Sequence, residues 1–335
     1  MGVTNAPAGT ADKIAEATFA DAVRDALADE MRRDPTVWVL GEDVRYGGIF
    51  GQYRGLAAEF GTERVVDTPI SESTIMGAGL GAALVGTRPV IEMRIADFAM
   101  PAMDELVNQI AKVRYMFGGQ ARSRLVVRMP HGLMPSSAAQ HSQIVEAWTA
   151  NLPGVVVAVP ATAADGAGLL RAAIRSDDPV LLFEPKAFFG RRAGPVGAEP
   201  IDFGRARRAR EGAGVTVVTW AQALDTAMAG AELAARDGVE AEILDLRTLW
   251  PWDEEAVAES SARTGRLVVV EEGVSVAGFG AEIVARMAER LGPRLRSVAR
   301  LGAPRIPVPF APELEAAVRI PPERVAAAIR AAAAR

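Results

Sequence analysis

The sequence contains no cysteine. Disulfide bonds, thiolate metal ligands and cysteine nucleophiles are therefore excluded, and a reducing compartment is permitted without being required. Histidine is also scarce, with two residues in the whole chain. Chemistry that needs an imidazole therefore has only His131 and His141 available.

Long apolar runs and a strong charge imbalance are absent as well. No segment approaches the ~20 apolar residues that cross a bilayer, so we expect no membrane partner. The net charge of −5 gives no indication of nucleic-acid binding. Residues 1–13 are small and polar and lack a hydrophobic secretory core. We therefore expect a flexible N-terminus and a cytoplasmic protein.

Valine- and isoleucine-rich runs are abundant, and they alternate with helical patterns. The 335 residues, 50% of them hydrophobic, are enough for two domains. In the first half, strands are predicted near 36–43, 63–69, 88–93, 124–130, 154–160 and 179–185, and helices near 18–31, 102–116 and 163–176. Continuous apolar strands separated by helices predict a doubly wound α/β domain with a parallel sheet.

After residue 184 the chain becomes rich in glycine, proline and arginine, and the alternation restarts near residue 215. Further strands are predicted near 215–220, 240–246, 266–272 and 296–302, with helices near 221–238, 253–265, 278–292 and 322–335. We therefore predict two doubly wound α/β domains, at 14–190 and 211–335, joined by a linker at 191–210.

The segment "DTPISESTIMGAGLGAALVG", residues 67–86, contains a GxGxxA pattern that is typical of dinucleotide-binding turns. In such turns the glycines follow the strand directly, whereas here "TPISESTIM" intervenes. With Ser71 or Ser73 as N-cap, Gly77 and Gly79 fall inside a helix, where they favour close packing rather than a cofactor. In dinucleotide-binding folds an acidic residue about 20 positions after the first glycine binds the ribose. Glu92 lies at about that separation in the sequence, so the dinucleotide alternative stays open.

Glu72 precedes these glycines at the junction between strand and helix. On its residue type alone, it is an acid in the first turn of a helix, stabilised by the helix dipole by ~0.3–1 kcal/mol.

Several blocks in order resemble a known family. They are "GEDVRYGGIF" (41–50), "FGTERVVDTPISE" (60–72), "GAALVGTRPVIEM" (81–93), "DFAMPAMDELVNQIAKVRYMFGGQ" (97–120), "QHSQ" (140–143), "AIRSDDPVLLFEPK" (173–186) and "DLRTLWPWD" (245–253). The chain resembles the β subunit of the thiamine-diphosphate-dependent decarboxylating component of 2-oxoacid dehydrogenase complexes. These include the pyruvate, branched-chain 2-oxoacid and acetoin types of the transketolase superfamily. The resemblance implies a pyrimidine-binding domain followed by a transketolase C-terminal-like domain.

The resemblance also implies roles for individual residues. Glu72 takes the place of the glutamate that hydrogen-bonds N1′ of the cofactor's aminopyrimidine and so activates thiamine diphosphate. His141 takes the place of a histidine that assists acyl transfer to a lipoyl group, for which an imidazole with a pKa near ~6.5 is suited. Without the resemblance, a loop histidine is more often a cap or a satisfied polar residue.

Other positions in or near these blocks have more than one interpretation. Phe98 matches an aromatic near the aminopyrimidine, with core packing as the alternative. Ile49, with Phe50, is expected in the same cofactor wall. The roles of His131 and Arg94 stay open: the first is expected in the cavity without a direct catalytic role, and the second faces either the pocket or solvent.

The "SDDP" turn, residues 176–179, resembles a segment that holds potassium in some relatives. A potassium site near Ala173, Ser176 and Asp178 is one interpretation, and a simple helix-ending turn is the other. Arg247, Glu271 and Glu272 stand at strand ends, where parallel-sheet sites often lie. We favour solvated loop charges for these three residues.

One motif of the superfamily is missing. Members that bind the cofactor unaided carry GDG followed, about 30 residues later, by an asparagine pair that ligates magnesium. This chain has neither. The resemblance therefore implies a partner α subunit that carries the magnesium ligands, in an α2β2 heterotetramer. It further implies contact with the lipoyl domain and the peripheral-subunit-binding domain of an acyltransferase core.

Three functions remain in competition. The first is a 2-oxoacid dehydrogenase β subunit, or the corresponding acetoin dehydrogenase subunit. The second is the C-terminal half of a split transketolase-like enzyme, which lacks the 97–120 pattern. The third is a scaffold without chemistry, against which the presence of both Glu72 and His141 argues. The sequence leaves the substrate and the identity of the α chain open.

Overall fold

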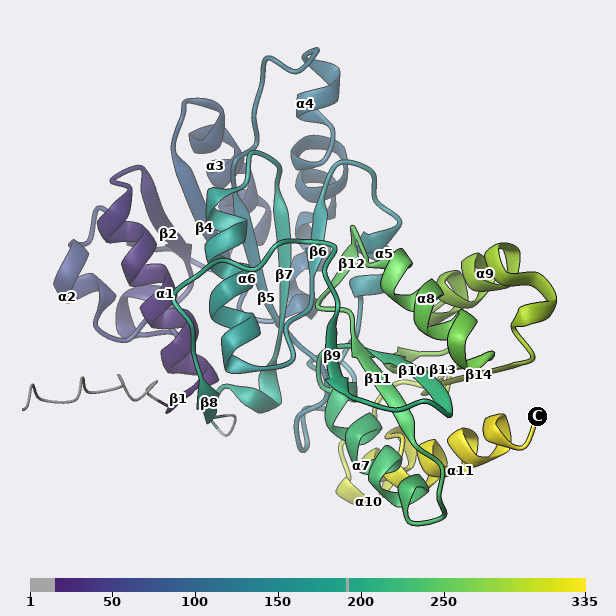
Figure 1. The fold of residues 1–335 in the computed structure, drawn as a ribbon. Helices are drawn as coiled ribbons and strands as arrows, with labels where there is room; N and C mark the ends of the chain where they lie inside the picture. The colour runs from purple at the N-terminus through teal and green to yellow at the C-terminus, as the bar shows by residue number, and fades with distance from the viewer. Residues whose placement is uncertain (1–15, 191–192) are drawn as a thin grey trace, which may run out of the picture.

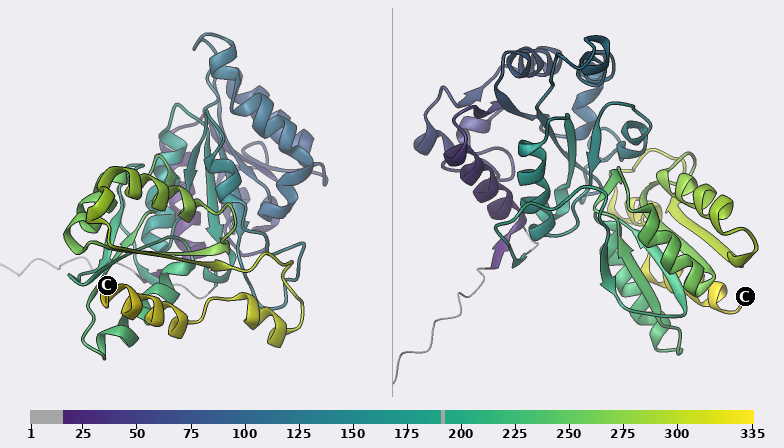
Figure 2. Two further views of the ribbon diagram at one scale, coloured as in Figure 1. Left: turned by 90° about the vertical axis from the view of Figure 1, so that its right-hand side faces the viewer. Right: turned by 45° about the horizontal axis from the view of Figure 1, so that its top comes forward.

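The computed structural model describes residues 16–190 and 193–335. The predicted flexible N-terminus, residues 1–13, lies outside the described residues. The chain forms two lobes, each built around its own sheet with helices on both faces (Figures 1 and 2). The predicted α/β class with two doubly wound domains is confirmed.

The first sheet has seven strands in the order β12-β6-β7-β5-β4-β2-β3. Six of them run parallel: β2 (Val37–Gly41), β3 (Val65–Asp67), β4 (Arg88–Glu92), β5 (Val126–His131), β6 (Val156–Ala158) and β7 (Val180–Pro185). Every residue of β5 and β7 is buried, as expected for strands covered on both faces. All six strands match predicted segments.

Helices α1 (Phe19–Arg33) and α6 (Ala163–Arg175) cover one face of this sheet, and α3 (Glu72–Leu84) covers the other (Figure 1). Thr18 caps α1 by accepting a hydrogen bond from the Asp21 amide. The apolar side chains that share one face of α1 are buried: Phe19, Val23, Ala26 and Leu27. The short helices α2 (Leu56–Phe60) and α5 (Glu146–Ala150) complete this lobe.

The helix predicted at 102–116 is helical but irregular. It follows a 3₁₀-helix (η2, Ala96–Ala102) and consists mainly of a π-helix (η3, Glu105–Ile110) and a short α4 (Val113–Met116). Pro101 within η2 lacks the amide donor that a regular α-helix needs. Apolar side chains of this segment are nevertheless buried: Leu106, Ile110 and Val113.

The second sheet has the order β14-β13-β10-β11-β9. Its parallel strands are β10 (Val215–Thr219), β11 (Ala241–Asp245), β13 (Arg266–Val274) and β14 (Ser297–Ala303). Side chains of α7 (Ala223–Ala235) and α11 (Pro322–Ala333) form one cluster against it. Those of α8 (Glu254–Thr264) and α9 (Phe279–Leu291) belong to a core cluster that continues into the first lobe. The helix α10 (Pro312–Val318) precedes α11.

Three pairings differ from the sequence analysis. Strand β9 (Arg207–Arg210) lies within the predicted linker but pairs antiparallel with β11. Strand β12 (Thr248–Trp250) lies within the predicted second domain but pairs antiparallel with β6 of the first sheet. Strands β1 (Glu16–Thr18) and β8 (Ala193–Pro195) form a separate two-stranded sheet. All are short edge strands, which lack the continuous apolar run that identifies a buried strand.

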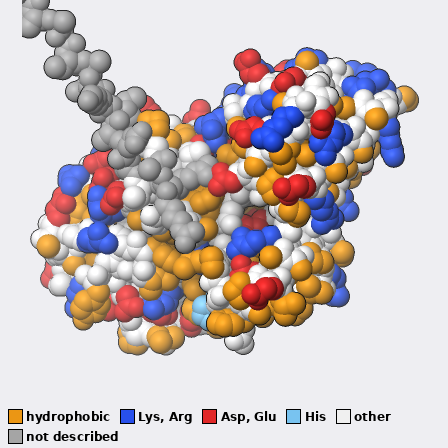
Figure 3. Space-filling model, turned by 90° about the horizontal axis from the view of Figure 1, so that it is seen from below, with side chains coloured by type: hydrophobic (Ala, Val, Ile, Leu, Met, Phe, Trp, Pro, Cys, Tyr) orange, Lys and Arg blue, Asp and Glu red, His pale blue; other side chains and the backbone are white. Residues whose placement is uncertain are grey.

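The surface carries charges of both signs. On the face seen in Figure 3, lysine and arginine side chains are interspersed with aspartate and glutamate. Within the part of the chain that the structure describes, no helix has the length and apolar character needed to cross a membrane.

Candidate active site

Several residues of the candidate site follow the ends of parallel strands. Because these strands are parallel, their carboxyl ends meet at one edge of the sheet, where sites in open α/β folds form. Glu42 follows β2, Thr68 follows β3, Arg94 follows β4, and Lys186 follows β7. The loop that carries His141 follows β5.

A surface hollow of about 530 Å³ lies at this edge. Glu72 is the first residue of α3 and is half-buried, with Ser71 at the N-cap position. The helix therefore begins where the sequence predicted, and its start sets the Glu72 carboxyl into the hollow. The hollow is lined by Glu42, Asp43, Thr68, Pro69, Ile70, Glu72, Arg94 and Phe98.

The rim of the hollow is acidic. Arg94 faces the hollow, and its guanidinium hydrogen-bonds Asp43 and lies 3.8 Å from the Glu42 carboxylate. The open question of its direction is thus resolved: it pairs with carboxylates. Burial raises the pKa of Glu42, Arg94 opposes that shift, and Glu72 adds to it. The only cation in the lining is therefore already paired within the chain.

Phe98 connects Glu72 with His141. The Phe98 side chain lines the hollow, and its ring meets the His141 imidazole edge to face, with centroids 5.3 Å apart. His141 is exposed. Three of the predicted site residues, one from α3, one from η2 and one from the loop after β5, therefore share one neighbourhood.

Ile49 and Phe50 are not among the residues that line the hollow. Phe50 stacks on Phe189, with ring centroids 4.7 Å apart, and joins the core cluster around α1 and α6. Ile49 is 39% exposed. The prediction that Phe50 forms part of a cofactor wall is not supported, because its ring is already packed against another aromatic.

The glycines of α3 have different environments. A side chain at Gly79 would place its Cβ 2.4 Å from Cδ1 of Ile91 in β4, so glycine is required there for close packing. A Cβ at Gly77 would have its nearest neighbouring atom, in the Glu105 side chain, 4.0 Å away, and a Cβ at Gly81 would have no such neighbour within 4 Å. The packing interpretation therefore holds for Gly79 alone. Glu92, the acid weighed as a ribose ligand, is buried and accepts a hydrogen bond from the Tyr53 hydroxyl.

A buried polar network lies beneath the strand ends. Arg128 in β5 donates two hydrogen bonds to Glu184 in β7, at 2.8 and 3.0 Å, and both side chains are fully buried. The Arg128 guanidinium also lies over the Tyr53 ring, 4.9 Å from its centroid. Burial raises the pKa of Glu92 to about 7. This network links β4, β5 and β7 and so supports the edge on which the hollow lies.

His131 lies in the interior rather than in the hollow. It is 1% exposed, and its ring meets the Phe183 ring edge to face at 5.4 Å. Burial lowers its pKa to about 3, with Lys186 adding to the effect. His131 is therefore neutral, and the expectation that it lines the cavity of Glu72 is wrong.

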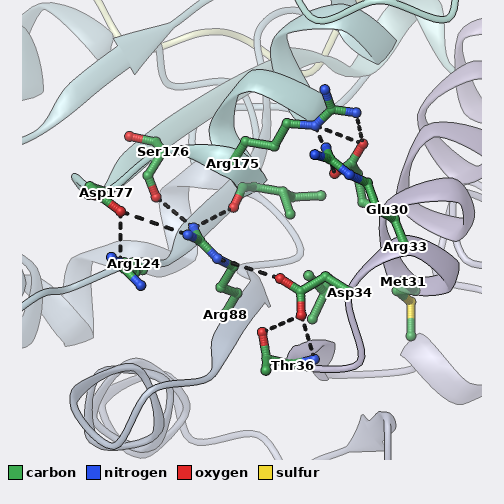
Figure 4. A network of polar contacts seen from close by, with 12 residues as sticks. Glu30, Met31, Arg33, Asp34, Thr36, Arg88, Arg124, Arg175, Ser176 and Asp177 are labelled. Carbon is green, nitrogen blue, oxygen red and sulfur yellow. Dashed lines mark hydrogen bonds and ion pairs between the residues drawn. The ribbon is translucent and has the colours of Figure 1, made fainter.

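The turn that ends α6 is held by arginine. Nη1 of Arg88 donates hydrogen bonds to the main-chain oxygens of Ile174, at 2.9 Å, and Ser176, at 2.8 Å (Figure 4). Asp177 pairs with Arg124, whose Nε lies 2.8 Å from its carboxylate. Potassium is bound in proteins by such carbonyl oxygens, and here a guanidinium already uses them.

The potassium interpretation therefore does not fit this chain. Asp178, one of the proposed ligands, pairs with Arg114. Ser176 is the C-cap of α6, which is the alternative interpretation of a helix-ending turn. Across residues 16–190 and 193–335, no group of three His, Asp or Glu side chains is arranged to hold a metal ion.

The three charges assigned to solvated loops in the second domain are buried or have a partner within the chain. Glu271 is 2% exposed, and burial raises its pKa to about 8. Glu272 accepts a hydrogen bond from the Leu133 amide at 2.8 Å. Arg247 lies 2.8 Å from the Asp165 carboxylate. Glu271 and Glu272 line a cavity of about 600 Å³ whose walls include Val145, Val274 and Val276.

Several further residues of the site were not predicted from the sequence. Thr68 and Ile70 line the hollow, and Ile70 is 78% exposed. Asp97 and Lys186 hydrogen-bond the loop of His141. Each of these residues belongs to one of the sequence blocks that resemble the family and lies at or just after the end of a strand. That position is the feature from which a site residue could have been predicted.

Two family models match the chain. The model for the transketolase pyrimidine-binding domain matches residues 15–190, and that for the transketolase C-terminal domain matches residues 204–325. The 2-oxoisovalerate dehydrogenase subunit beta of Bacillus subtilis is 41% identical over 318 residues, covering 93% of this chain and 97% of the relative. The chain belongs to the family of 2-oxoacid dehydrogenase β subunits.

Other members of this family are similarly close. The mitochondrial pyruvate dehydrogenase E1 component subunit beta of Dictyostelium discoideum is 38% identical, covering 92% of this chain and 89% of the relative. The acetoin:2,6-dichlorophenolindophenol oxidoreductase subunit beta of Cupriavidus necator is 41% identical, covering 88% of this chain and 90% of the relative.

The fold also has a solved counterpart. A split-gene transketolase, described as an inactive beta4 tetramer, superposes with a TM-score of 0.76 at 23% identity and covers 95% of this chain and 98% of its own. At this identity the likeness shows the shared fold of the family.

Proposed function

We propose that this β subunit forms the pyrimidine half of a thiamine-diphosphate site, which a partner α subunit completes. The hollow carries the proposal, because it combines the Glu72 carboxyl with the Phe98 ring at the carboxyl edge of the sheet. A flat, apolar heteroaromatic ring with a basic nitrogen fits a carboxyl group beside an aromatic wall.

The diphosphate half of the cofactor does not fit this chain. The rim carries Glu42 and Asp43, whose negative charges repel phosphate, and Arg94 is already paired with them. Magnesium requires several oxygen ligands in octahedral geometry, which we assign to the α subunit. An α2β2 assembly accounts for both halves of the site.

Bound thiamine diphosphate supplies a nucleophilic thiazolium carbon and an electron sink for decarboxylation of a 2-oxoacid. Glu72 holds the proton at pyrimidine N1′, which its place at the start of α3 makes possible. Phe98 keeps water from that contact and fixes the rotamer of His141 through the edge-to-face contact. His141 is exposed, so its imidazole is accessible to an incoming lipoyl group and can exchange a proton with it during acyl transfer.

The acceptor is then the lipoyl domain of an acyltransferase core, which also docks the subunit through its peripheral-subunit-binding domain. The relatives include pyruvate, 2-oxoisovalerate and acetoin enzymes, so these three define the substrates to assay. The cytoplasmic location expected from the sequence stays a prediction, since some relatives carry the word mitochondrial in their names.

Calorimetry tests the divided site. The chain alone and the chain co-purified with its α partner are each titrated with thiamine diphosphate and magnesium. We expect tight binding only by the heteromer, and tight binding by the chain alone would overturn the proposal.

A substitution tests the role of Glu72. In the heteromer, Glu72→Gln should lower turnover with an artificial electron acceptor by roughly 10²–10⁴-fold, the usual contribution of a positioned proton-transfer group. Glu63→Gln changes an exposed glutamate of the same block and serves as the control. Each variant is assayed with pyruvate, branched 2-oxoacids and acetoin. Unchanged turnover in the Glu72 variant would remove this residue from the mechanism.

A further inference from the structure

The loop that carries His141 is held from the second domain. The amide of Leu133, at the start of the loop, donates a 2.8 Å hydrogen bond to Glu272 in β13. The amide of Ser136 donates a 2.8 Å hydrogen bond to Glu315 in α10. Main-chain groups of an irregular loop thus obtain partners from charged side chains more than a hundred residues away in the sequence.

The end of the loop is held from the first domain. The ammonium group of Lys186 donates a hydrogen bond to the main-chain oxygen of His141 itself. Two residues on, the Gln143 amide donates a hydrogen bond to Asp97 at 3.2 Å. The backbone is therefore held at His141 by the ammonium group of Lys186 and, two residues later in the sequence, by the carboxylate of Asp97.

Of the two lysines that the structure describes, Lys186 is the buried one, with 4% of its surface exposed. Burial lowers its pKa, while the carboxylates of Asp97, Glu272 and Glu315 act in the opposite direction. A buried ammonium is costly unless charges and hydrogen-bond acceptors surround it. Here those carboxylates come from the same elements that hold the loop, so one charge cluster determines where the loop lies.

We propose that Lys186 is a positioning residue for His141: its hydrogen bond to the His141 carbonyl fixes the backbone from which the imidazole reaches Phe98. This rests on the proposed role of His141 in acyl transfer. Lys186 is not among the residues that line the hollow, and we assign its effect on acyl transfer to its contact with His141. A displacement of about 1 Å of a catalytic group lowers rates by roughly 10²-fold, so the loss of this hydrogen bond has a measurable effect.

The test uses the α2β2 enzyme with Lys186→Met, Lys186→Arg and a matched control, Lys112→Met. Lys112 also donates to a main-chain carbonyl, that of Pro153 at 3.0 Å, but at the surface and outside the loop. Two activities are measured: acylation of a free lipoyl domain, and turnover with an artificial electron acceptor. We expect Lys186→Met to lower kcat for lipoyl acylation by about 10- to 100-fold. Artificial-acceptor turnover should fall by less than about 3-fold, and Lys186→Arg should recover most of the acylation rate.

A second readout does not depend on activity. Carbethoxylation of His141 by diethyl pyrocarbonate, followed by mass spectrometry, reports on its exposure and setting, and wild-type enzyme labelled in parallel serves as the reference. We expect the labelling rate of His141 to rise several-fold in Lys186→Met and to be unchanged in Lys112→Met. An unchanged labelling rate, or an equal loss of both activities, would overturn the positioning role. If the wild-type enzyme fails to acylate any lipoyl domain, the proposed function fails, but the labelling result still decides whether Lys186 fixes His141.

Discussion

The ring of Phe98 meets the imidazole of His141 edge to face, with ring centroids 5.3 Å apart. The two residues lie 43 positions apart in the sequence, and Phe98 also lines the hollow that contains Glu72. The imidazole thus has one apolar neighbour that restricts its rotation and one open side. This contact joins the two predicted catalytic residues through a single side chain.

Replacing His141 should separate two activities. In the heteromer, His141→Asn should lower acylation of a lipoyl domain by roughly 10²-fold or more, because an amide cannot exchange a proton near neutral pH. Turnover with an artificial acceptor should fall much less. Phe98→Leu, which keeps apolar volume, should reduce acylation by less than His141→Asn does. Equal losses of both activities in the histidine variant would contradict a role confined to acyl transfer.

Because arginine side chains hold the turn at the end of α6, we expect the stability of the fold not to depend on potassium. Thermal unfolding of the wild-type protein should give the same Tm in potassium chloride and in tetramethylammonium chloride of equal ionic strength. Arg88→Met should lower stability by about 1–3 kcal/mol, because the oxygens of Ile174 and Ser176 lose their donor. Arg122→Met removes an exposed ion pair to Asp177 and should change stability by less than about 1 kcal/mol. A saturable rise of the wild-type Tm with potassium would mean that an ion binds after all.

Because the pKa of Glu271 is raised, we expect the stability of the fold to depend on pH. Its folded-state pKa is raised to about 8 by burial, whereas the ordinary value is 4.5. Between these values the folded state binds more protons than the unfolded state, so this residue's contribution to stability falls as pH rises from about 5 to about 8. Glu271→Gln removes that penalty.

The measurement compares this variant with the wild type at two pH values. The difference in unfolding free energy, variant minus wild type, should be more positive at pH 8 than at pH 5.5. Taking a difference removes most of the contribution of Glu272, whose pKa burial raises to about 7, whereas Glu146 interacts directly with Glu271 and contributes to the measured difference. The same difference at both pH values would show that Glu271 does not retain its proton.

The glycines of α3 should respond differently to alanine. Gly79→Ala forces a Cβ against Ile91 in a packed interior and should destabilise the fold by about 1–3 kcal/mol. Gly81→Ala adds a methyl group to an open helix surface and should be neutral or stabilising by up to ~1 kcal/mol. Chemical unfolding of both variants provides the comparison. A similar cost at the two positions would argue against the packing role of Gly79.

The sequence by itself determined the regular elements and the place of Glu72. Buried parallel strands need continuous apolar runs and amphipathic helices need a 3.6-residue period, and both patterns are local. The six parallel strands of the first sheet and helices such as α1 and α6 therefore match predicted segments. Glu72 could be located because a strand, a turn and a helix start lie together within a few residues, as quoted in "DTPISE". The resemblance then supplied a role for it.

The tertiary structure decided which distant groups meet. Lys186 reaches the His141 carbonyl across 45 positions, and Arg88 reaches the Ser176 oxygen across 88. Short edge strands such as β12 join a sheet in the other lobe, and Glu271 is buried although its sequence context is that of a loop charge. No local pattern encodes these contacts, because a long polar side chain can satisfy its charge with any partner that the chain path brings within reach. The fold's elements thus follow from periodicity in the sequence, whereas the charge pairing that supports the site follows from how those elements pack.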